Sequence, residues 1–83
     1  MRTNVSIKFN SIEEYREIEK KLEELGYVND KGWNEYKINI ITDGCVGIYD
    51  VVINENLIYL FTVFDSMHEY EIIYNNLEEF LNY

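Results

Sequence analysis

The chain has 83 residues, which is enough for one hydrophobic core and too few for two. Hydrophobic residues make up 47% of it and aromatic residues 16%, so it has the bulky side chains that disordered proteins lack. The formal net charge of −9 argues against nucleic acid as a direct ligand, because phosphate binding requires Lys and Arg.

The sequence also predicts a soluble protein of a reducing compartment. It contains no run of about 18 apolar residues, so we expect no membrane span. Residues 1–10 lack the apolar stretch and the cleavage site of a secretory signal. Cys45 is the only cysteine and cannot form an internal disulfide. We therefore expect a cytoplasmic location.

The first part of the chain predicts a strand followed by a helix. Residues 4–9 alternate between apolar and polar side chains, as in a half-buried strand. Residues 11–25 predict a helix, because Ser11 and Glu14 form a capping box ahead of an amphipathic pattern. Residues 26–34 have the composition of a loop that can include a short strand.

A β-hairpin is predicted next. Two runs rich in β-branched residues, 36–42 and 45–53, are separated by an Asp-Gly pair, which is a strong signal for a two-residue hairpin turn. Such a turn would place Lys37 opposite Asp50 and thereby pair unlike charges across the strands.

The last part of the chain predicts a turn, a strand and a second helix. Residues 54–56 form the turn, and the apolar run 57–64 indicates a strand buried on both faces or covered by a partner. A second capping box, Ser66 to Glu69, opens a helix predicted over 67–81. This helix would bury Tyr70, Ile73, Tyr74, Leu77 and Leu81. The whole chain is thus predicted to be a single α+β domain in the order β-α-β-β-β-α. An antiparallel three-strand meander and the N-terminal strand would carry two packed helices.

Charge is distributed unevenly along the chain. Residues 1–37 hold all seven basic side chains and eight acidic ones, which gives a net charge of −1. Residues 38–83 hold eight acidic side chains and no Lys or Arg, which gives −8. Because concentrated like charge destabilises a small domain, this asymmetry favours a functional acidic surface over a role in solubility alone.

The two predicted helices differ in the same way. In helix 11–25 the acids have basic partners at helical spacing, which is typical of an ordinary solvated face. Glu13 is spaced to pair with Arg16, and Glu17 with Lys20 and Lys21. Helix 67–81 has no basic residue, and its helical wheel aligns four acceptors in one row: Glu71, Asn75, Glu78 and Asn82.

We therefore predict that segment 38–83 binds a basic protein. Tyr and Trp are enriched at the centres of interfaces, so exposed aromatic side chains, including Trp33, are added to the acids as candidates. The predicted partner-binding residues are Asp50, Glu55, Glu69, Glu71, Glu78, Glu79, Tyr49, Tyr59 and Tyr83.

The sequence offers no convincing catalytic or metal-binding constellation. His68 is the only histidine, and its cluster with Asp65 and Glu69 fits helix capping better than a metal site. No calcium loop or Gly-rich phosphate loop is present. We therefore predict a protein that is not an enzyme and that requires no metal or cofactor.

In size and charge the chain resembles small acidic inhibitors of phages and mobile elements, including anti-CRISPR and anti-restriction proteins that mimic nucleic acid. The resemblance covers the whole chain and depends on no motif. It implies a non-enzymatic inhibitor, active in the host cytoplasm, that occupies the channel of a basic nuclease. Asp50, Glu55, Glu71 and Glu78 would then stand in for phosphates.

Two alternatives remain at this stage. One is an immunity protein or antitoxin that neutralises a basic toxin, which would use the same kind of acidic face. The other is a homo-oligomeric subunit that assembles through the apolar strand 57–64. The expected oligomeric state is accordingly a monomer or a homodimer.

Overall fold

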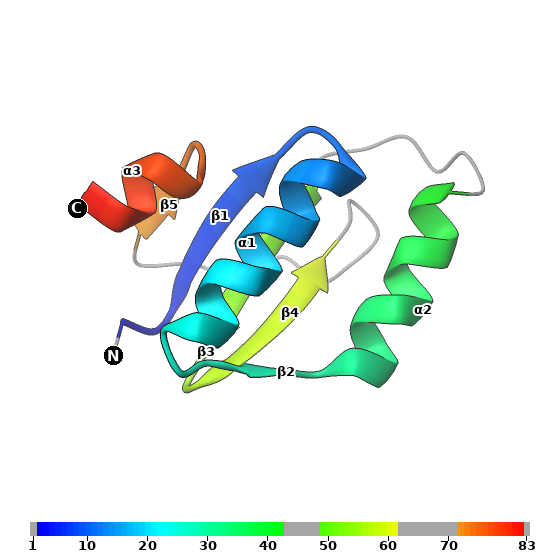
Figure 1. Cartoon of the computed structure of the whole chain (residues 1–83), viewed down its shortest axis with the longest axis horizontal. Coiled ribbons are helices and arrows are strands. Elements are labelled where there is room, and N and C mark those ends of the chain that lie inside the picture. Colours follow the sequence, from blue (N-terminus) through cyan, green and yellow to red (C-terminus); the bar gives the residue numbers. More distant parts are fainter. Residues whose placement is uncertain (1, 43–48, 62–71, 83) are drawn as a thin grey trace.

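The computed structural model describes residues 2–42, 49–61 and 72–82 (Figure 1). In chain order the elements are β1 (Val5–Phe9), α1 (Ile12–Glu24), β2 (Val28–Asn29), α2 (Lys31–Thr42), β3 (Tyr49–Asn54), β4 (Leu57–Phe61), β5 (Ile72–Tyr74) and α3 (Leu77–Asn82). The strands form one sheet in the order β2-β4-β3-β1-β5. The pairs β1–β3 and β3–β4 are antiparallel, whereas β1–β5 and β2–β4 are parallel. The chain is a single α+β domain, as predicted, but the sheet is mixed. Helix α2 stands in place of the end of the predicted loop 26–34 and of the first strand of the predicted three-strand meander.

The core lies between the sheet and helix α1. Every residue of β1 except Lys8 is buried, and α1 buries Tyr15, Ile18 and Leu22 at helical spacing. Figure 1 shows α1 lying across one face of the sheet, α2 beside β4, and α3 beside β1 and β5. The predicted first strand and first helix are confirmed, because both follow from patterns within a few consecutive residues.

The predicted short strand and the predicted turn are also confirmed. The first is β2, and the second joins β3 to β4 with Glu55 at a positive φ of 58°. The predicted strand 57–64 is present as β4 over its described residues. Ile58 and Leu60 are buried on one face, whereas Leu57 and Tyr59 on the other face are half-buried.

The predicted β-hairpin is wrong. Residues 36–42 form the second half of helix α2, and the Asp-Gly pair lies outside the described residues. Asp30, which lies in the predicted loop, caps this helix. Its carboxylate accepts a hydrogen bond from the Trp33 main-chain amide (3.2 Å). Asp50 pairs across the sheet with Lys8, not with Lys37.

Helix α2 replaces a strand because it satisfies the main chain of β4. The side-chain amide of Asn34 donates to the Ile58 carbonyl (3.1 Å), and its oxygen accepts from the Leu60 amide (2.7 Å). The Trp33 indole donates to the Leu60 carbonyl (2.9 Å). Buried main-chain groups need partners, and β2 pairs with only the first two residues of β4. These tertiary bonds override the local strand propensity of α2.

The predicted helix 67–81 is wrong at residues 72–76 and confirmed at 77–81. Ile72–Tyr74 forms the edge strand β5, and α3 is the helical part of the described residues in this range. Tyr74 is buried as predicted, but Ile73 is exposed because it lies on a short edge strand. Leu81, also predicted to be buried, is 41% exposed at the end of α3. Residues 67–71 and the Ser66 capping box lie outside the described residues.

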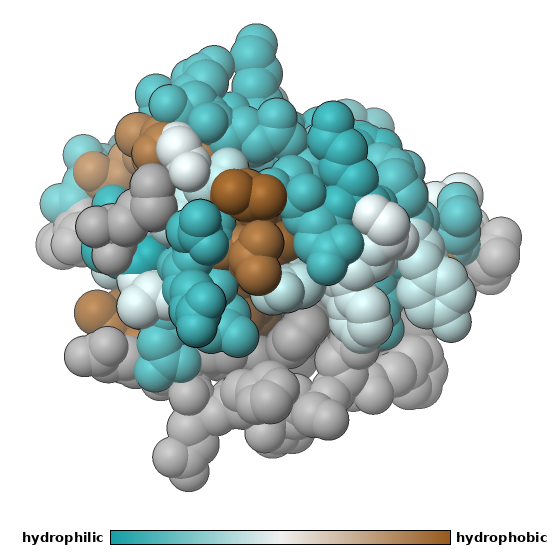
Figure 2. Space-filling model, turned by 90° about the horizontal axis from the view of Figure 1, so that it is seen from below, coloured by the Kyte–Doolittle hydropathy of each residue, from teal (hydrophilic) through white to brown (hydrophobic). Residues whose placement is uncertain are grey.

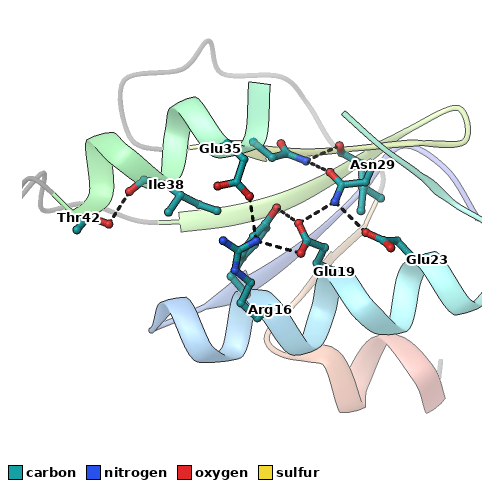
Figure 3. A network of polar contacts seen from close by, with 10 residues as sticks. Arg16, Glu19, Glu23, Asn29, Glu35, Ile38 and Thr42 are labelled. Atoms are coloured by element: carbon teal, nitrogen blue, oxygen red, sulfur yellow. Dashed lines mark hydrogen bonds and ion pairs between the residues drawn. The ribbon is translucent and has the colours of Figure 1, made fainter. Parts of the chain in front are cut away.

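A polar network joins α1 to β2 and α2 (Figure 3). The Glu19 carboxylate accepts hydrogen bonds from Tyr15 (2.8 Å), Asn29 (2.7 Å) and Arg16 (3.1 Å), and Arg16 also donates to Glu35 (3.1 Å). Burial opposes ionisation of Glu19, but the three hydrogen bonds outweigh it and lower its pKa. The network therefore stabilises the fold through an ionised Glu19.

We expect Glu19→Gln to lower the free energy of unfolding at neutral pH by about 1–2 kcal/mol. The amide oxygen still accepts hydrogen bonds, but the charge assistance is lost. The pKa of Glu19 is lower in the folded state than in the unfolded state. Its contribution to stability is therefore complete above the unfolded-state pKa, and it disappears as pH falls through the folded-state pKa. Urea denaturation across this range should show the two proteins converging in acid. A difference that stays constant with pH would contradict this assignment.

Candidate functional site

The predicted binding residues are spread over several elements. Asp50 lies at the start of β3 and Glu55 just beyond its end, about 16 Å apart along the strand. Tyr59 is half-buried on β4, and Trp33 is half-buried beside the same strand. Glu78 and Glu79 lie on α3. Glu69, Glu71, Tyr83 and the side chain of Tyr49 lie outside the described residues.

The predicted row of acceptors on one helix is not formed. Asn75 precedes α3, and the residues before Asn75 belong to strand β5, so no continuous helix connects the positions of the row. Glu78 and Asn82 do share α3, where the Asn82 amide donates to the Glu78 carbonyl (3.0 Å). The acids of α3 therefore have to be considered together with their neighbours in space.

Asp50 is half-buried on the sheet and is poorly suited to binding. Burial raises the pKa of Asp50, and the Lys8 ammonium and the Ser6 hydroxyl oppose this only in part. One carboxylate oxygen of Asp50 is buried without a hydrogen-bond partner. Ionised Asp50 therefore costs the folded protein stability.

We expect Asp50→Asn to raise the melting temperature at neutral pH and to give no gain in acid. The folded-state pKa of Asp50 lies above its unfolded value, so the cost of its charge is present at neutral pH. That cost disappears as pH falls through the folded pKa and below the unfolded pKa. Thermal melts of the variant and of Glu55→Gln, an exposed turn control, test this. An equal loss of stability by Asp50→Asn at both pH values would show that Asp50 has a stabilising partner.

A groove of about 610 Å³ lies between α1 and α3. Figure 1 shows strand β1 passing between these two helices. The carboxylates of Glu14, Glu17 and Glu78 line the groove together with four asparagine side chains. Its apolar lining consists of Ile18, Leu77 and Leu81. No Lys or Arg is present among the described residues that line it. It is therefore acidic and rich in amides, with a smaller apolar part.

Capping interactions fix both walls of the groove. The Glu14 carboxylate accepts a hydrogen bond from the Asn10 amide (3.1 Å) within the predicted capping box of α1. At α3, the Glu79 amide donates to the Asn76 side chain (2.8 Å), and the Glu79 carboxylate accepts from the Asn75 amide (2.9 Å). This is an N-cap with Glu three residues later, a signal that was present in the sequence. Glu14 and Glu79 are thus tied to helix ends.

Glu17 and Glu78 supply the uncompensated charge of the groove. Both are exposed, and the described side chains offer neither carboxylate an ion pair. The predicted pairing of Glu17 with Lys20 and Lys21 is not formed; Lys21 lies 3.8 Å from Glu24 instead. Helix α1, predicted to be an ordinary solvated face, therefore provides one wall of the candidate site.

Three basic side chains are in contact with other groups of the described chain. The Arg2 guanidinium lies 3.8 Å from the centroid of the Phe80 ring, and the Lys37 ammonium lies 4.6 Å from that of Trp33. Arg16 bridges Glu19 and Glu35. Of the three, Lys37 is buried, so its positive charge does not offset the carboxylates of the exposed surface.

Apolar side chains are exposed at only a few described positions. The face of the molecule in Figure 2 is mainly hydrophilic around a small hydrophobic patch. The large hydrophobic side chains exposed among the described residues are Leu25, Val28, Tyr36, Ile72, Ile73 and Leu81. Of these, Leu81 alone lines the groove. Acidic and accessible apolar groups thus occur together at this site.

The structure gives no support for a metal site or a membrane span in the part of the chain that it describes. No cluster of three potential metal ligands occurs there, and none of the helices is long and apolar enough to cross a bilayer. Asp65, His68 and Cys45 lie outside the described residues.

Comparisons of the chain with protein-family models, with curated proteins and with solved structures found no match. The geometry and charge of the groove are therefore the features that indicate a function.

Proposed function

We propose that the domain is a non-enzymatic inhibitor that binds a basic, nucleic-acid-binding protein through an acidic surface centred on the groove between α1 and α3. One observation carries the proposal: three carboxylates line the groove, and no Lys or Arg does so among its described residues. A surface of this kind is complementary to a cleft that binds phosphates. By occupying that cleft, the domain would exclude nucleic acid from it.

Electrostatics favours this partner in two further ways. The net charge of −9 repels nucleic acid, whose binding depends on counterion release by Lys and Arg. The same charge speeds the encounter with a basic protein and makes binding dependent on salt, because exposed charges more than about 8–10 Å apart are screened at physiological ionic strength.

Competition with nucleic acid tests the proposal. A partner is captured on the immobilised domain from a lysate of the source cell at low salt, identified, and purified. Its binding to a fluorescent oligonucleotide is then measured at increasing concentrations of the domain. We expect displacement of the oligonucleotide that weakens as salt rises. A captured protein that binds the domain and its oligonucleotide together would contradict the proposal.

A further inference from the structure

The walls of the groove are two helical faces. On α1, Glu14, Glu17 and Ile18 line it at helical spacing, and on α3 it is lined by Leu77 and Leu81, one turn apart. One turn of helix advances about 5–6 Å, so the groove offers a helical ligand one to two turns of contact. Adjacent helical faces of this kind accept a further helix, which packs its ridge into the groove.

The lining of the groove includes apolar side chains, which electrostatic binding alone does not require. Leu81 is 41% exposed, and Leu77 beside it is half-buried. Covering such carbon surface contributes roughly 25 cal/mol per Å². A ligand that offered only charged groups would leave Leu81 exposed to water. The complementary ligand therefore carries apolar side chains as well as basic ones.

Two carboxylates of the groove determine where the basic groups of a ligand can bind. Glu17 lies on one wall and Glu78 on the other, and the described side chains form no ion pair with either carboxylate. Lys or Arg residues that flank the apolar stripe of a bound helix would reach both walls. Such charge-assisted hydrogen bonds are about twice as strong as neutral ones.

We infer that the groove binds a short amphipathic helix of the partner, with its apolar stripe on Leu77 and Leu81 and its Lys or Arg side chains at Glu17 and Glu78. This inference rests on the proposed function and specifies its binding mode. It differs from mimicry of nucleic acid by charge alone, because part of the affinity comes from apolar contact.

Two synthetic helical peptides with equal numbers of Lys test the inference against the full chain. One carries a stripe of Leu, and the other carries Gln at the same positions. We expect the Leu peptide to bind at least about tenfold more tightly, as measured by fluorescence anisotropy. Backbone NMR shifts should change mainly in α3 and in the first half of α1.

Two variants make the test specific. Leu81→Ser should weaken binding of the Leu peptide about tenfold and leave the lower affinity of the Gln peptide unchanged. Leu25→Ser is the matched control, because Leu25 is 44% exposed and lies outside the groove lining. It should leave the affinity for both peptides unchanged.

The outcomes separate the inference from the proposed function. Equal affinity for the two peptides would overturn the helix-binding mode and leave an acidic binding surface in place. Absence of binding by both peptides would overturn the binding mode together with the proposed function. Equal losses from Leu81→Ser and Leu25→Ser would also overturn the assignment to the groove.

Discussion

Asn34→Ala is expected to lower the free energy of unfolding by about 2–5 kcal/mol. Asn34 is 1% exposed, and its side chain bonds to the Ile58 carbonyl and the Leu60 amide. Truncation leaves the buried Leu60 amide without this partner, at about 1–3 kcal/mol. It also removes the bonds from Asn34 to the Ile58 carbonyl, which still accepts from the Asp30 amide (3.5 Å), and to Asn29, at about 0.5–1.5 kcal/mol each. Since small domains are stable by only about 5–15 kcal/mol, this is a large fraction of the total. Urea denaturation measures it.

The control is Asn54→Ala, at an exposed position on β3, which should change stability by less than about 0.5 kcal/mol. Asn34→Asp provides a second check. Its carboxylate can accept from the Leu60 amide but cannot donate to the Ile58 carbonyl, whereas the protonated acid can do both. Part of the lost stability should therefore return as pH falls. Stability of Asn34→Ala equal to that of the parent would show that α2 does not hold the edge of β4.

The double reversal Glu17→Lys with Glu78→Lys should weaken binding of the Lys/Leu peptide on the order of a hundredfold. Each reversal replaces an attraction by a repulsion, and two swings of about 1–2 kcal/mol each correspond to this factor. Stability should be unchanged or slightly higher, because both carboxylates lack ion pairs among the described residues and the reversal reduces the excess negative charge around Glu14 in the same groove.

A matched variant separates local from global charge. Glu13→Lys with Glu55→Lys changes the net charge by the same amount, and both positions are exposed outside the groove lining. We expect its affinity for the Lys/Leu peptide to fall only severalfold, through reduced long-range attraction. Most of this difference from the parent protein should disappear at high salt, where long-range attraction is screened. Equal losses in the two double variants would mean that the overall charge, not the groove, determines binding.

The acidic character of the candidate site could be predicted from sequence, but its composition could not. The segment after residue 37 contains Glu78, which lies in the groove, and it also contains Asp50 and Glu55, which lie elsewhere. Glu17 was expected to be paired along its own helix. Which acids gather depends on α3 lying beside α1, and this arrangement follows from the pairing of β5 with β1.

Local interactions determined the first strand, the first helix and the turn at Glu55, and they are readable from sequence because each involves residues only a few positions apart. The same applies to the total charge. Helix α2 was decided by tertiary structure, since Asn34 and Trp33 meet β4 partners 24 to 27 positions away. The β-propensities of residue types differ by only about 1 kcal/mol, whereas leaving a buried main-chain group without a hydrogen bond costs about 1–3 kcal/mol. For that reason the edge of β4, and not the composition of residues 36–42, selects the helix.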